Sequence, residues 1–157
     1  MTLNLDNKGL KSITNEFELF FIDIWGVVHN GIKLFQNSIN VLNELERNKK
    51  EYVLLTNAPR PNSDVIKFLK KMGLDDDKCQ KVYTSGEAAL KHLNSKWKNS
   101  KFFHIGPPRD FNLFKMFEKN KVKNTDEAEL LLCTGLFDNY DKDLDFYKNL
   151  LKSKIDK

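Results

Sequence analysis

One aspartate follows an apolar run, in a position where its carboxylate could act as a nucleophile. The stretch FFIDIWGVVHNG covers Phe20 to Gly31, and Asp23 is its first acidic residue. A carboxylate can attack an electrophilic phosphorus or carbon atom, and it can also bind a metal ion. A simpler interpretation is that Asp23 only caps the loop after a strand. Hydrophobic periodicity alone leaves both interpretations open.

Two more polar residues end the next apolar run. The stretch EYVLLTN covers Glu51 to Asn57, so Thr56 and Asn57 follow their run as Asp23 follows the first. Ligands of open α/β sheets bind at the carboxyl ends of parallel strands, so we expect these three side chains to share one crevice. Gly26 permits a sharp loop after Asp23, and the backbone amides of that loop could hold an anion.

The elements that must position these residues alternate between strands and helices. Short apolar runs predict strands at 18–25, 51–57, 81–84, 101–106 and 128–135. Helical spacing or capping residues predict helices at 37–48, 61–72, 85–93, 110–117 and 141–154. This alternation predicts an α/β fold with a Rossmann-like parallel sheet. Because the first run is apolar at nearly every position, we expect that strand to be covered on both faces.

Finer predictions concern caps, core residues and the domain division. Asp110 is predicted to cap its helix, and the phenylalanines of 111–117 have the spacing of a buried helical face. Cys133, in an apolar run, is predicted to lie in a core, whereas Cys79 lies in a polar turn. The polar stretch at 95–100 predicts a linker, with one domain at 1–100 and a second at 101–157.

Composition excludes several classes of protein. The chain has 157 residues, 40% of them hydrophobic, and a net charge of +4 spread over interleaved basic and acidic residues. These values are typical of a globular protein. The sequence has no basic cluster of the kind that indicates binding to nucleic acid. The first ten residues lack the pattern of a signal peptide, and no apolar run reaches the length of a membrane span. Two dissimilar cysteines favour a reducing compartment. We therefore expect a cytoplasmic protein with no nucleic-acid or membrane partner.

Four stretches in order resemble the haloacid dehalogenase (HAD) superfamily, subclass IIA, the group of NagD-type phosphatases. They are FFIDIWGVVHNG, YVLLTNAPR, VYTSGEAALKHL and FFHIGPPRD. The resemblance extends over nearly the whole chain from about Phe17, and it is strongest to a branch whose first motif reads Asp-x-Trp-Gly-Val. It implies that the first domain is the N-terminal part of a HAD core and that the second is part of an α/β C2-type cap.

The resemblance assigns roles to individual residues. Asp23 matches the nucleophile that forms an aspartyl-phosphate and also a Mg²⁺ ligand, and Trp25 matches the position whose backbone carbonyl binds the metal. Thr56 matches the hydroxyl that hydrogen-bonds the phosphoryl group. The remaining predicted substrate-binding residues are Gly26, Val27, Asn57 and Arg60. The implied reaction is Mg²⁺-dependent hydrolysis of a small phosphorylated metabolite, with a homo-oligomer as a further expectation.

Two departures from the family pattern bear on activity. Trp25 occupies the position of the family's acid/base aspartate, and an indole cannot transfer that proton. Positioned acid/base groups contribute roughly 10²–10⁴-fold, so the implied reaction is slow or uses another donor such as His29. The family's third-motif lysine and fourth-motif acidic pair have no match after Gly135. We therefore expect a fragment or truncated product that is impaired or inactive by itself.

Alternative functions stay open at this stage. A catalytically silent HAD fold that binds a ligand is favoured by Trp25 and by the unmatched motifs. An aromatic residue two positions after the nucleophile also resembles the metal-independent C–halogen hydrolases. A general nucleotide-binding α/β module ranks last, because the sequence has no glycine-rich phosphate-binding motif. For Arg60, Ser85 and His104, a structural role competes with a functional one.

Overall fold

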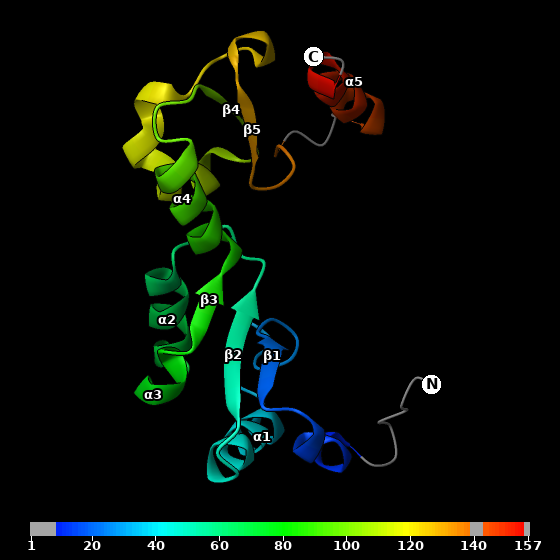
Figure 1. The fold of residues 1–157 in the computed structure, drawn as a ribbon, viewed down its shortest axis with the longest axis vertical. Coiled ribbons are helices and arrows are strands. Elements are labelled where there is room, and N and C mark those ends of the chain that lie inside the picture. The colour runs from blue at the N-terminus through cyan, green and yellow to red at the C-terminus, as the bar shows by residue number, and fades with distance from the viewer. Residues whose placement is uncertain (1–8, 139–142, 156–157) are drawn as a thin grey trace. The chain divides into compact units, whose positions relative to one another are not determined.

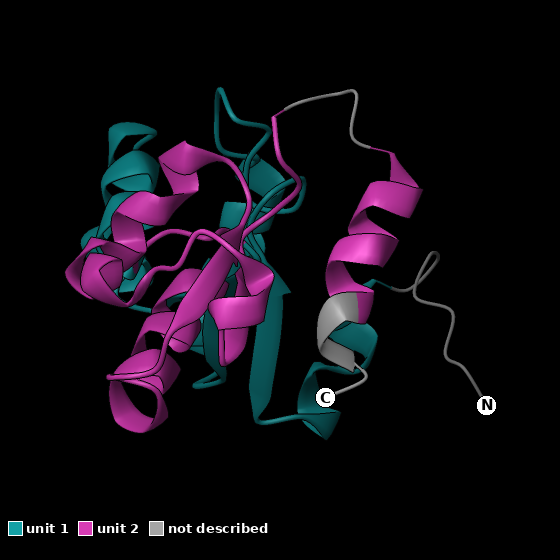
Figure 2. Ribbon diagram, turned by 90° about the horizontal axis from the view of Figure 1, so that it is seen from above, with its two compact units in different colours: residues 1–57, 62–84 teal, residues 58–61, 85–157 magenta. Residues whose placement is uncertain are grey.

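The computed structural model describes residues 9–138 and 143–155, the last three of these by backbone alone, and divides the chain into two compact units. Unit 1 comprises residues up to 57 together with 62–84, and unit 2 comprises 58–61 together with the residues from 85 onward. Figures 1 and 2 show the elements and the membership of each unit. Sequence analysis predicts a division near residue 100, whereas the compact units divide at Thr84, before the helix that precedes the polar stretch.

Unit 1 is built on a parallel sheet with the strand order β1-β2-β3, so β2 is central. Its strands are β1 (Leu19–Asp23), β2 (Glu51–Thr56) and β3 (Val82–Thr84). Its helices are η1 (Leu10–Ser12), η2 (Thr14–Glu16), α1 (Gln36–Arg47), α2 (Asn62–Lys71) and α3 (Asp76–Cys79). Every strand pairing is parallel. The predicted α/β architecture with a parallel sheet is confirmed.

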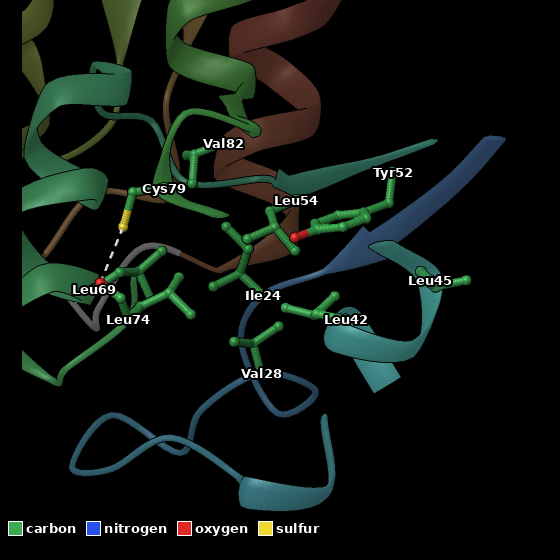
Figure 3. Packing of buried hydrophobic residues seen from close by; sticks show 10 residues of the cluster. All are labelled: Ile24, Val28, Leu42, Leu45, Tyr52, Leu54, Leu69, Leu74, Cys79 and Val82. Atoms are coloured by element: carbon green, nitrogen blue, oxygen red, sulfur yellow. Dashed lines mark hydrogen bonds between the residues drawn. The ribbon is translucent and has the colours of Figure 1, made fainter. Parts of the chain in front are cut away.

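The core of unit 1 lies between one face of this sheet and its helices, as Figure 3 shows. Tyr52 and Leu54 of β2 contribute to it, and so do Leu42 and Leu45 of α1 and Leu69 of α2. Leu42 and Leu45 lie three residues apart, which places them on one buried stripe of α1. The helices predicted at 37–48 and 61–72 correspond to α1 and α2.

The opposite face of the sheet is open, contrary to prediction. Side chains alternate between the faces of a strand, and β1 alternates between exposed and partly buried residues. Leu19 and Phe21 point away from the core and are 47% and 68% exposed, and Leu55 of β2 is 41% exposed. The prediction that β1 is covered on both faces is therefore wrong for the described residues. An apolar run reveals that a strand can be buried, but it does not reveal what covers it.

Unit 2 contains a second parallel pair, β4 (Phe102–Ile105) with β5 (Leu130–Cys133). Its helices are α4 (Ser85–Lys96), η3 (Pro108–Asn120), η4 (Thr125–Glu127) and α5 (Leu144–Ile155). The predicted helix at 141–154 corresponds to α5, and residues 141 and 142 lie outside the described part of the chain.

The core of unit 2 is aromatic. Phe111, Phe114 and Phe117 of η3 are buried with Phe102 of β4. Their spacing of three matches the three residues per turn of a 3₁₀-helix, so one face of η3 supplies all of them. The predicted burial of these phenylalanines is confirmed. The prediction that Asp110 caps the helix is wrong, because η3 begins at Pro108, a residue suited to the first turn, and Asp110 lies inside it.

In unit 2, side chains at the ends of β4 and β5 contact each other. His104 is buried on β4, and its Nε2 lies 2.8 Å from the hydroxyl of Thr134, just after β5. Gly106 follows β4, and a Cβ there would lie 2.2 Å from the Thr134 Oγ1, so only glycine fits at this approach. Burial, together with the charge of Lys121 and against that of Asp110, lowers the pKa of His104. These contacts support the structural role for His104, one of the two that sequence analysis left open.

The burial of the two cysteines is the reverse of the prediction. Cys79, predicted in a polar turn, is fully buried at the end of α3. Cys133, predicted in a core, is exposed, because it alternates with the buried Leu132 on β5. Both cysteines are free. Within the part of the chain that the structure describes, no helix combines the length and apolar character needed to cross a membrane.

Candidate functional site

A cavity of about 430 Å³ opens at the carboxyl ends of β1 and β2 in unit 1. Its lining comprises Phe21, Asp23, Leu55, Thr56 and Asn57. Three of these are the polar residues that sequence analysis expected to converge. The cavity therefore lies at the end of the sheet where open parallel sheets bind ligands.

Strand register explains why these residues meet. Asp23 is the last residue of β1 and pairs in register with Leu55, so Thr56 and Asn57 extend one and two positions beyond it. The side chain of Asp23 is exposed, and one carboxylate oxygen accepts the Ile24 N–H at 2.8 Å. The carboxylate is thus held by its own loop at the mouth of the cavity, where an incoming electrophile could reach it.

The loop after Asp23 folds back on its first residue. The Ile24 carbonyl accepts the N–H of Val28 at 2.8 Å, and the Gly26 N–H donates to the His29 carbonyl at 2.8 Å. Gly26 has φ +77°, a left-handed conformation that glycine adopts without strain. The sharp loop expected at Gly26 is present, and Ile24 and Val28 anchor its start in the unit 1 core.

Trp25 packs along this loop. Its indole ring lies over Gly31, where a Cβ would come within 2.7 Å of the ring, and it meets the His29 ring edge to face at 5.2 Å. Gly31 has φ +88°, so both its conformation and its neighbour require glycine. The side chain is 63% exposed, so the indole lies over the loop with its outer face in solvent.

His29 is a structural residue of the same loop. Its ring is buried, packs against Phe68 of α2 at 5.4 Å and accepts the Gly31 N–H through Nδ1 at 2.8 Å. Burial lowers the pKa of His29, so the ring is neutral at pH 7. A neutral ring with Nδ1 already occupied leaves only Nε2 to carry the proton. These contacts favour the packed role over the catalytic one that sequence analysis left open.

The cavity lining does not include the other predicted substrate-binding residues. Gly26 and Val27 belong to the loop and are not among the five lining residues; the Val27 carbonyl accepts the Ser38 hydroxyl. Arg60 belongs to unit 2, where its backbone would be within 2.6 Å of a Cβ on Gly86. The functional roles of Gly26, Val27 and Arg60 stay predictions.

Ser85 and Gly86 hold a turn of unit 2. The Ser85 hydroxyl donates to the Ala58 carbonyl at 3.2 Å, and the Gly86 N–H donates to the same oxygen at 3.1 Å. This double anchor accounts for both residues at the start of α4, in agreement with the structural interpretation.

Sequence reasoning missed two lining residues, Phe21 and Leu55. Strand alternation could have identified Phe21, because it lies two residues before Asp23 and therefore shares the same face of β1. Once β1 and β2 are paired in register, Leu55 must also lie beside Asp23. They were missed because both were assigned to a buried core.

A metal ion would find few protein ligands in the part of the chain described. No group of three or more His, Cys, Asp or Glu side chains among these residues could hold one. Asp23 supplies the single carboxylate of the cavity lining. Mg²⁺ commonly binds through one or two carboxylates, water and substrate phosphate. The residues present thus fit part of a Mg²⁺ site, with the Trp25 carbonyl as the further ligand expected by resemblance.

Comparison with known proteins agrees with this architecture. A haloacid dehalogenase-like hydrolase from Brucella suis 1330 is similar with a TM-score of 0.70 and 29% identity, over 91% of this chain and 54% of that one. A structure that carries the name nagD protein has a TM-score of 0.59 and 25% identity, over 90% and 53%. A p-nitrophenyl phosphatase from Archaeoglobus fulgidus, at 18% identity, has a TM-score of 0.62 over 88% and 52%.

The chain spans about half the length of these solved structures. The search of curated proteins gave no match. The family model described as haloacid dehalogenase-like hydrolase matches residues 20–119, which include β2, all of β1 except Leu19, and every residue of the cavity lining. The chain therefore belongs to the family of haloacid dehalogenase-like hydrolases.

Proposed function

We propose that this chain carries the nucleophile half of a phosphatase site, in which Asp23 attacks a phosphoryl group. The observation that supports this most directly is the position of Asp23, beside Thr56 and Asn57 in one cavity at the strand ends. Family membership supports a hydrolase, and the phosphatase named above has the same fold. The substrate class, a small phosphorylated metabolite, is part of this proposal.

The proposed reaction has two steps. A carboxylate oxygen of Asp23 attacks phosphorus, the bond from phosphorus to the ester oxygen breaks, and an aspartyl-phosphate forms. Water then attacks phosphorus, the bond to Asp23 breaks, and inorganic phosphate leaves. In both steps the Thr56 hydroxyl and the Asn57 amide would donate hydrogen bonds to the phosphoryl oxygens, whose charge rises toward the transition state.

Mg²⁺ is the proposed cofactor. When bound, it would offset the negative charge that keeps a phosphate dianion from approaching a carboxylate. Asp23 and the Trp25 carbonyl are the residues of this chain that would hold it. Binding can be tested without turnover, since Mn²⁺ at this position would broaden the NMR signals of residues 23–27, and Asp23→Asn should prevent that broadening.

Binding without turnover is a second candidate function. The observation in its favour is Trp25, whose indole lies over Gly31 and whose position in the family pattern belongs to the acid/base carboxylate. A site with a nucleophile but without this carboxylate could hold a phosphorylated ligand and release it unchanged.

Trapping a phosphoryl mimic distinguishes the two candidates. Beryllofluoride with Mg²⁺ should form an adduct on Asp23, visible by ¹⁹F NMR, and Asp23→Asn should abolish it. Asp64→Asn, on α2 of the same unit and outside the cavity lining, is the control and should keep the adduct. An adduct combined with measurable release of phosphate supports the phosphatase, whereas an adduct without release supports the silent binder. Absence of any adduct in the native chain overturns both.

Cellular location and self-association are two further proposals. A cytoplasmic location is supported by the two free cysteines, and self-association is supported by the open sheet face. Sedimentation velocity at several concentrations tests the second of these.

A further inference from the structure

We propose that unit 1 contains a second ligand site, which binds a free amino acid with an aliphatic side chain. The site is a cavity of about 420 Å³ between α1 and the turns η1 and η2, which Figure 1 shows beside that helix in dark blue. This volume is typical of small-molecule pockets. The α1 cavity shares no lining residue with the cavity at the strand ends, so the proposal is independent of the phosphatase reaction.

The α1 cavity has an apolar floor. Leu45 is buried in the core of unit 1, and Val41, one helical turn earlier, lines the cavity on the same side of α1. Leu10 adds apolar surface from η1, where the Thr14 hydroxyl donates to the Leu10 carbonyl at 2.9 Å and closes the turn. An aliphatic side chain placed against these residues would be removed from water, which favours binding.

The lining also contains one charge of each sign. Lys11 of η1 carries a positive charge, and Glu44 of α1 carries a negative charge. A free amino acid at neutral pH has an ammonium and a carboxylate on the same carbon atom. It can therefore meet an opposite charge at both of its ends, whereas a simple anion or cation would also meet a like charge, which disfavours it.

Two amides of the lining complete this arrangement with a donor and an acceptor. The Asn40 Oδ1 accepts a hydrogen bond from Gln36 at 3.1 Å, which leaves the two N–H groups of Asn40 to donate to a carboxylate. The Asn48 Nδ2 donates to the Glu44 backbone carbonyl at 2.7 Å, which leaves Oδ1 to accept from an ammonium. Glu44 lies one helical turn from each asparagine, so the three form one row along α1. Lys11 and Asn40 would thus bind the carboxylate, and Glu44 and Asn48 the ammonium.

The present partner of Glu44 is easily displaced. Glu44 accepts a hydrogen bond from Arg47, and the two side chains are 61% and 73% exposed. Exposed ion pairs of this kind contribute little free energy. A ligand ammonium can therefore compete with Arg47, which is not part of the cavity lining.

A ligand series tests the charge pair and the apolar floor. Leucine, 4-methylpentanoate and 3-methylbutylamine share one branched chain, but the second lacks the ammonium and the third lacks the carboxylate. Amide chemical shifts of the ¹⁵N-labelled chain at residues 10–15 and 40–48 give the affinities. We expect leucine to bind with a Kd of about 1 mM or below. Each of the other two should bind at least about 10-fold more weakly, the effect of one lost charge-assisted hydrogen bond. Glycine, without the side chain, should also bind about 10-fold more weakly.

Charge-neutralising variants test the assigned residues. Lys11→Gln and Glu44→Gln should each weaken leucine binding at least about 10-fold. Lys33→Gln and Glu16→Gln remove the same charges from exposed positions of unit 1 outside the lining, and they should keep the affinity. Arg47→Gln removes the competitor for Glu44 and should strengthen binding about twofold. Far-UV circular dichroism checks that each variant is folded.

Four results would overturn the proposal. The first is no saturation by leucine below about 10 mM. The second is equal affinity for leucine and any of the other three ligands. The third is an equal loss of affinity in the lining variants and in their matched controls, which would indicate attraction by the net charge alone. The fourth is a set of shifts confined to residues 21–23 and 55–57, which would place leucine in the cavity at the strand ends.

Discussion

Both units contain parallel strands, but their strand ends differ, and the difference supports the proposed location of the chemistry in unit 1. In unit 1, Asp23 and Thr56 line a cavity of about 430 Å³. In unit 2, His104 and Thr134 meet each other at 2.8 Å across the corresponding ends. Thr134 lies at a close approach of the two strand ends, whereas Thr56 borders a space that a ligand could enter. The strand topology is shared, and the surroundings of the strand ends differ.

The substitution that should lower stability the most lies in unit 2 and should leave unit 1 folded. Phe114→Ala removes a nearly fully buried ring from the aromatic core, which should lower the free energy of unfolding of that unit by about 4 kcal/mol. Hydrogen exchange read by mass spectrometry should show faster exchange in 85–138 and unchanged exchange in 19–56. Equal acceleration in both ranges would show that the units unfold together.

Two neighbouring leucines of β2 sharpen the contrast between the faces of the unit 1 sheet. Leu54 is fully buried and Leu55 is exposed on the open face. Leu54→Ala should therefore cost about 3 kcal/mol of stability, and Leu55→Ala less than about 1 kcal/mol. Urea denaturation of the two variants checks this. Similar losses would mean that the open face is covered in solution.

Substitution of Thr56 and of Thr134 tests the comparison between the strand ends of the two units. Thr56→Val should reduce phosphate release about 100-fold, since one donor to the developing charge is lost. Thr134→Val should leave phosphate release unchanged and cost about 1 kcal/mol of stability, the usual value of one hydrogen bond. For each variant, steady-state kinetics measures the rate of phosphate release and thermal denaturation measures the stability. A catalytic loss in Thr134→Val would contradict the assignment of chemistry to unit 1.

The smallest effect concerns the pH dependence of unit 2. Burial lowers the pKa of His104 below its ordinary value of 6.5, so as the pH falls the unfolded chain takes up this proton before the folded one. The stability from the neutral ring is therefore complete above pH 6.5 and declines below it. His104→Asn should flatten this decline. Denaturation of the native chain and the variant between pH 5 and 7.5 measures the difference.

The sequence was sufficient to predict the strands, most helices and the convergence of Asp23, Thr56 and Asn57. These features depend on local periodicity and on a general property of parallel sheets. It was insufficient for the open face, because the apolar character of Phe21 does not specify whether another element covers it. The environments of Cys79 and Cys133 were mispredicted for a related reason: burial depends on which face of an element meets the core.

The loop after Asp23 also shows the limit of residue types as evidence. His29 was identified as a candidate for the acid/base role that Trp25 cannot fill, and the contacts of these two residues reveal a packed pair on Gly31. That packing depends on a left-handed glycine two residues after the histidine, a geometric relation that no single residue type indicates.

The chain has two tryptophans, and they are distributed one to each unit. Trp25 contacts the ring of His29 in unit 1, and Trp97 donates its indole N–H to His92 in unit 2 at 3.3 Å. Each indole thus emits light from beside an imidazole of its own unit. Replacing either one by phenylalanine would leave a single fluorophore that reports on one half of the molecule, without any attached dye.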